Sequence, residues 1–135
     1  MTARRLVDTN LIVRHLTQDH PAHAEVAGKL FAACDRGELT LMLLPEVLAE
    51  CVFVLESFYK HPRDQIARAL RDLISSPGIE IEQVELHRNA LDRYGDGKLH
   101  FVDCTIAAAA VLSRMPIATF DAGLKKLGDV EVIVD

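Results

Sequence analysis

Residues 39–58, LTLMLLPEVLAECVFVLESF, change from a strand pattern to a helix pattern at a single proline. The six residues before Pro45 are apolar except for one threonine, which is typical of a short buried strand. After Pro45, apolar side chains recur at spacings of three and four residues, which is typical of a buried helix. A strand that passes directly into a helix is the repeating unit of a parallel α/β sheet.

The same alternation extends in both directions from this stretch. Upstream we expect a strand at Leu6-Val7, a helix over 11–16 and a longer helix over 21–36. Downstream we expect helices over 63–74, 86–94 and 101–114, a short helical turn over 123–126, and strands over 79–84, 117–120 and 130–134. The pattern predicts one α/β domain over residues 1–135, with a central, mostly parallel sheet of four to five strands flanked by helices.

Composition restricts the kind of protein. The chain has 135 residues, half of them hydrophobic, which suits one folded domain. A formal net charge of −5 argues mildly against nucleic-acid binding, unless the acids gather around a metal ion. The three cysteines match no zinc motif or disulfide framework, and no signal peptide or membrane-length apolar run is present. We therefore expect reduced thiols, a cytoplasmic location and no membrane partner.

Two acids directly follow apolar strands. Asp8 comes after Leu6-Val7, and Asp121 comes after the predicted strand over 117–120. Ligands of parallel sheets collect beyond the carboxyl ends of the strands, so both acids should lie at one rim if their strands are neighbours. Either acid taken alone is more simply interpreted as a turn or helix-cap residue.

Two further acids interrupt apolar helices. Glu50 lies inside the helix that Pro45 opens, and Asp103 lies in the first turn of the helix over 101–114. Burying an unpaired carboxylate is costly, and no Lys or Arg lies within four residues of either acid. Because oxygen ligands suit Mg²⁺ or Mn²⁺, a bound cation is the expected partner, and it would activate a water for attack on phosphorus. Alternatively, Glu50 lies on a solvated flank and Asp103 answers the helix dipole.

Four segments, in this order, resemble the motifs of PIN domains: LVDTN around Asp8, VLAECVFVL around Glu50, FVDCTIAAAA around Asp103 and IATFDAGLKKL around Asp121. The resemblance implies that these four acids are catalytic and bind the metal, and that Asn10 and Thr119 support them by hydrogen bonding. The size of the chain is similar to that of VapC-type toxins. That similarity implies an endoribonuclease with an RNA substrate, an antitoxin partner and a homodimeric state.

Three other features keep more than one interpretation. His100 stands where many PIN domains carry an additional acid. Without that acid, a second metal would bind weakly or only together with substrate. His100 itself is either a phosphate contact or an ordinary loop residue. Glu46 follows a helix-opening proline and is left outside the site, because an acid there answers the helix dipole. The basic segment from Lys60 to Arg71 would steer RNA, contact an acidic partner, or form a solvated helix face.

Two other functions compete with the nuclease interpretation. A phospho-receiver-like signalling switch would need a pair of acids after the first strand and a phosphorylatable Asp at the end of a mid-chain strand. The first strand offers only Asp8, and no predicted mid-chain strand ends in Asp. A catalytically idle PIN domain that acts as a binding module is disfavoured because all four acids are present.

Overall fold

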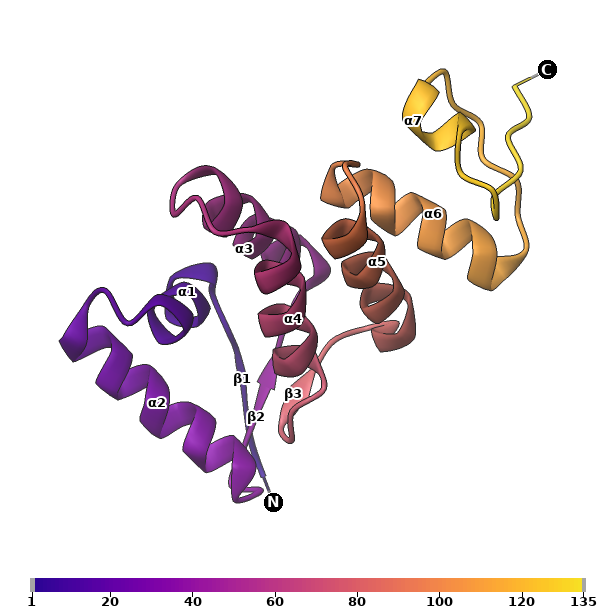
Figure 1. The fold of residues 1–135 in the computed structure, drawn as a ribbon. Coiled ribbons are helices and arrows are strands. Elements are labelled where there is room, and N and C mark those ends of the chain that lie inside the picture. The colour runs from indigo at the N-terminus through magenta and orange to yellow at the C-terminus, as the bar shows by residue number, and fades with distance from the viewer. Residues whose placement is uncertain (1, 135) are drawn as a thin grey trace.

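The computed structural model describes residues 2–134 and shows strands and helices alternating along the chain (Figure 1). The elements are β1 (Ala3–Leu6), α1 (Thr9–Thr17), α2 (Pro21–Asp35), β2 (Leu39–Met42), α3 (Pro45–Ser57), α4 (Arg63–Ile74), β3 (Ile79–Glu80), α5 (Val84–Asp96), α6 (Phe101–Ser113) and α7 (Ala122–Lys125). The α/β class predicted from the sequence is confirmed. No helix among these residues is long and apolar enough to span a membrane.

The sheet has three parallel strands in the order β1-β2-β3. Helices α1 and α2 connect the first two strands, and α3 and α4 connect the second to the third. In Figure 1, α2 lies on one side of the strands and α4 on the other. β1 is an edge strand, and all four of its residues are exposed.

The expected sheet of four to five strands is wrong for this structure, which contains three within residues 2–134. The segments over 117–120 and 130–134 form only one isolated parallel bridge, between Ile117 and Val132. We call residues 115–134 the C-terminal arm. Figure 1 shows that α6 leads away from the sheet, so the arm has no sheet strand beside it to extend its pairing.

The main core lies between the sheet and its helices. Alternate residues of β2 are buried, and the inward face of α3 includes Leu48 and Cys51, both with no exposed surface. A second, smaller cluster joins α6 to the arm through Ala107, Ala110, Ile117 and Leu124. Helix α6 is not buried on all sides, since Val102 and Leu112 are 59% and 53% exposed.

Candidate metal centre

Asp8 stands at the carboxyl end of β1, as the sequence predicts, and it also caps helix α1. Its Oδ1 accepts a hydrogen bond from the backbone N–H of Thr9 at 2.8 Å, and its backbone is extended. A carboxylate at a helix N-terminus is favoured by the unpaired N–H groups there. The cap uses Oδ1 and leaves Oδ2 without a partner in the described residues, so the cap and metal-ligand interpretations of Asp8 are compatible.

Thr9 connects Asp8 to Glu50. Its hydroxyl donates a hydrogen bond to Oε1 of Glu50, which lies one helix away on α3. The Thr9 side chain is fully enclosed, since the residue is only 5% exposed, so its rotamer is set by packing. Helices α1 and α3 pack against each other and place both acids around Thr9 at the end of the sheet. Thr9 was not predicted to be a site residue, although it lies between Asp8 and Asn10 in LVDTN.

The negative charges of Asp8 and Glu50 both affect the pKa of the buried Cys51 thiol. The pKa of Cys51 is raised to about 12, chiefly because burial penalises the thiolate and further because Glu50 and Asp8 are negative. Within residues 2–134, no Lys or Arg forms an ion pair with either acid. Both acids are exposed, so the expected burial of Glu50 is wrong, and Glu50 lies on a solvated flank of α3. The negative charge at this end of the sheet is balanced by no ion pair with Lys or Arg within residues 2–134.

Asp121 belongs to the C-terminal arm, whereas Asp103 lies nearer the sheet, since its neighbours Phe101 and Cys104 on α6 are buried in the main core. Asp103 lies in the first turn of α6, and Asp121 caps α7, where its Oδ2 accepts from the backbone N–H of Leu124 at 2.8 Å. The Thr119 hydroxyl accepts a hydrogen bond from the backbone N–H of Asp121 at 3.0 Å. In Figure 1, α7 is separated from the end of β1 by α3 and α5.

The single chain does not gather the four acids. Among the residues that the structure describes, no three His, Cys, Asp or Glu side chains lie close enough together to hold a metal ion. The carboxylates have the chemistry that Mg²⁺ or Mn²⁺ prefers, but one chain arranges them as Asp8 with Glu50 on one side and Asp121 on the other. A shared rim required the two strands to be neighbours, and here they are not.

The remaining candidates have clear positions. Asn10 is exposed and lines an apolar pocket of α1 and α2 with Leu11 and Val26. His100 is exposed at the start of α6, where its side chain makes no cap bond. Glu46 is exposed in the first turn of α3, as the dipole argument predicts.

Two arginines of the basic segment from Lys60 to Arg71 interact with other parts of the protein. Arg63 donates to the backbone carbonyls of Tyr94 and Leu99, stacks 3.9 Å from the centre of the Tyr94 ring, and pairs with Glu56 at 3.4 Å. Arg71 pairs with Asp92 of α5 at 2.6 Å. These two arginines connect α4 to α5, whereas Lys60 and Arg68 form no ion pair within residues 2–134.

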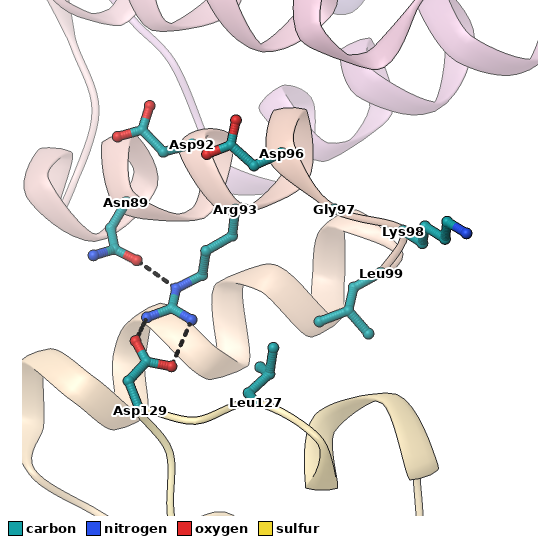
Figure 2. Close-up of a pocket in the computed structure, with 9 residues that line it drawn as sticks. All are labelled: Asn89, Asp92, Arg93, Asp96, Gly97, Lys98, Leu99, Leu127 and Asp129. Atoms are coloured by element: carbon teal, nitrogen blue, oxygen red, sulfur yellow. Dashed lines mark hydrogen bonds and ion pairs between the residues drawn. The ribbon is translucent and has the colours of Figure 1, made fainter.

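A pocket of about 450 Å³ lies between α5 and the C-terminal arm, and none of the four acids lines it (Figure 2). Its centre is occupied by Arg93, which bonds both carboxylate oxygens of Asp129 and the Oδ1 of Asn89. Leu99 and Leu127 face each other beside this ion pair. The pocket is therefore the seam along which the arm is attached to α5.

Comparisons with known proteins give one family model and two similar proteins. A family model described as PIN domain matches residues 5–130, a range that includes all four acids. A VapC ribonuclease of Aquifex aeolicus is 24% identical over 125 residues, which cover 92% of this chain and 92% of that protein. The crystal structure of Mycobacterium tuberculosis VapC20, titled a sarcin-ricin loop cleaving toxin, is 23% identical with a TM-score of 0.44; the match covers 96% of this chain and 98% of that one.

Proposed function

This chain belongs to the PIN domain family, and we propose that it is an Mg²⁺- or Mn²⁺-dependent endoribonuclease, the toxin of a type II toxin–antitoxin pair. The observation that carries the proposal is the joining of Asp8 and Glu50 through Thr9 at the carboxyl end of the sheet, with no ion pair to Lys or Arg within residues 2–134. The similarity to a protein named VapC ribonuclease supports RNA as the substrate, an antitoxin as a partner and the cytoplasm as the location.

The proposed metal ligands are Asp8, Glu50, Asp103 and Asp121. Their oxygens suit a hard divalent cation, which is the reason for proposing Mg²⁺ or Mn²⁺. Two of the four stand at helix caps and one in a first helical turn, where a negatively charged side chain interacts favourably with the helix dipole. We also propose that the protein acts as a homodimer, because one chain alone does not bring the ligands together.

RNA cleavage with matched acid variants tests this function. We expect the wild type to cleave RNA only with Mg²⁺ or Mn²⁺. Asp8→Asn and Glu50→Gln should lose more than the roughly 10- to 100-fold that removing a residue behind a metal ligand costs. Glu46→Gln is the control, since Glu46 lies one turn before Glu50 on α3 and should keep full activity.

The same assay distinguishes the alternatives. Cleavage that is equally fast in Asp8→Asn, or insensitive to a chelator, would contradict a metal nuclease. Transfer of phosphate from a small phosphodonor to one Asp would favour the signalling switch. RNA binding without cleavage in the presence of either metal would favour an idle binding module.

A further inference from the structure

The proposed metal site is divided between two parts of the chain that the structure holds apart. Asp8 and Glu50 lie at the sheet, whereas Asp121 lies on the arm beyond α5 (Figure 1). What completes the metal site is inferred here on the basis of the proposed function.

The edge of the sheet that leads to Asp8 is open. β1 pairs with β2 on one side only, and its residues Ala3–Leu6 are exposed, with Leu6 72% exposed. An edge strand with exposed backbone groups and an apolar side chain is a template for pairing with another strand. Arg5 gives this edge a positive charge and has no ion pair within residues 2–134, whereas Arg4 is paired with Glu80 of β3 at 3.3 Å.

The C-terminal arm has strand sequences without a sheet. Its strands meet only at the Ile117–Val132 bridge, and Phe120 is 89% exposed directly before Asp121. The described end of the arm, residues 129–134, contains Asp129 and Glu131 and no basic residue. Because Asp129 is paired with Arg93 and the arm also contains Lys125 and Lys126, the arm matches the β1 edge through its exposed apolar side chains and its strand sequences, and not through charge.

The arm is fixed in a position from which it does not reach its own β1. The Arg93–Asp129 pair ties it to α5, and Leu99 and Leu127 pack beside that pair (Figure 2). Arg63 fixes the carbonyl of Leu99 just before α6 begins. If the arm moved to pair with β1 of its own chain, its contacts with α5 would break. The β1 strand of a second copy can approach the arm while those contacts stay intact.

We propose that two copies of this chain exchange their arms, so that residues 117–120 of one copy pair in parallel with β1 of the other. Leu6 stands two residues before Asp8, and Thr119 stands two residues before Asp121. Pairing Leu6 with Thr119 places the two acids side by side at one rim. The contact is reciprocal under two-fold symmetry, so the dimer has two metal sites, each with ligands from both chains.

Complementation between two inactive variants tests the exchange. One variant carries Asp8→Asn and Glu50→Gln in the body of the chain, and the other carries Asp121→Asn in the arm. The two are mixed, unfolded and refolded together so that chains pair at random, and bound Mn²⁺ is counted by electron paramagnetic resonance. We expect neither variant alone to bind Mn²⁺, and the mixture to recover about one quarter of the wild-type sites, because half of the dimers are mixed and each has one intact site.

The outcomes separate the inference from the proposed function. If the wild type binds Mn²⁺ and the refolded mixture recovers no sites, each site lies within one chain: the exchange is overturned and the nuclease proposal is unaffected. If the wild type itself binds no Mn²⁺, the proposed metal site fails, and a metal-independent measurement decides the exchange.

That measurement is disulfide cross-linking between two different chains. A Leu6→Cys chain is refolded with a Thr119→Cys chain and oxidised mildly; the three native cysteines are buried. We expect a covalent dimer containing one of each chain. As a control, Leu6→Cys refolded with Arg68→Cys, which is exposed on α4, should give none. A monomeric mass in light scattering together with no Leu6–Thr119 cross-link would overturn the exchange.

Discussion

Thr9 is the residue on which the candidate half-site depends, because its hydroxyl holds Glu50 while its backbone N–H holds Asp8. Thr9→Val keeps the shape of the buried side chain and removes only the hydrogen bond. We expect this variant to weaken Mn²⁺ binding roughly 10-fold or more, as loss of a group that orients a metal ligand does. Thr9→Ser keeps the hydroxyl and should bind Mn²⁺ nearly as the wild type does.

Isothermal titration calorimetry with Mn²⁺ measures this difference. Equal dissociation constants for Thr9→Val and Thr9→Ser would show that the hydrogen bond to Glu50 does not position a ligand. Both variants should unfold within about 1.5 kcal/mol of the wild type, the usual net contribution of one hydrogen bond.

At the residue scale, the sequence locates the acids better than the residues that hold them. Asp8 and Asp121 are identifiable because each follows an apolar strand, and both are capping residues as well. Thr9 was not predicted because a threonine after a strand has no distinctive pattern. Its role comes from α3 packing against α1, a contact between residues 41 positions apart.

Arg63 connects α4 to the end of α5 and to the loop before α6, because it donates hydrogen bonds to the backbone carbonyls of Tyr94 and Leu99. Arg63→Met removes hydrogen bonds to two backbone carbonyls and the pair with Glu56, in a side chain that is only 24% exposed. We expect the free energy of unfolding to fall by about 3 kcal/mol, because partly buried carbonyls lose a charged donor. Urea denaturation measures the change.

Arg68→Met is the matched control on the same helix. Arg68 is exposed, and no ion pair involves it within residues 2–134, so its loss should change stability by no more than about 0.5 kcal/mol. Equal destabilisation of the two variants would mean that Arg63 contributes only as a surface charge.

At the element scale, helices are predicted well and isolated strands poorly. Helices α2, α3 and α4 begin at or near the positions that Pro21, Pro45 and Pro62 indicate, because proline sets the local backbone. The segments over 117–120 and 130–134 have strand sequences but form a single bridge. A strand needs a neighbour, and its neighbour depends on the path of α6, which no local pattern encodes.

At the scale of the whole molecule, the α/β class was predictable from alternation alone, whereas the meeting of the acids was not. Each acid has a local signal, but their convergence depends on which strand lies beside β1. The structure leaves that edge open and holds the arm against α5. The order of the motifs identifies the family. Whether the arm pairs with β1 of its own chain or of a second copy decides how the metal site is assembled.

The central claim is that acids from the sheet and from the arm share one metal ion. Calorimetric Mn²⁺ titration of the wild type, Asp8→Asn and Asp121→Asn tests it directly, with Glu131→Gln as the control for an exposed acid on the arm. We expect one Mn²⁺ site per chain in the wild type and in Glu131→Gln, and affinity at least about 10-fold weaker in both aspartate variants. Wild-type affinity in Asp121→Asn, with binding lost in Asp8→Asn, would contradict this claim.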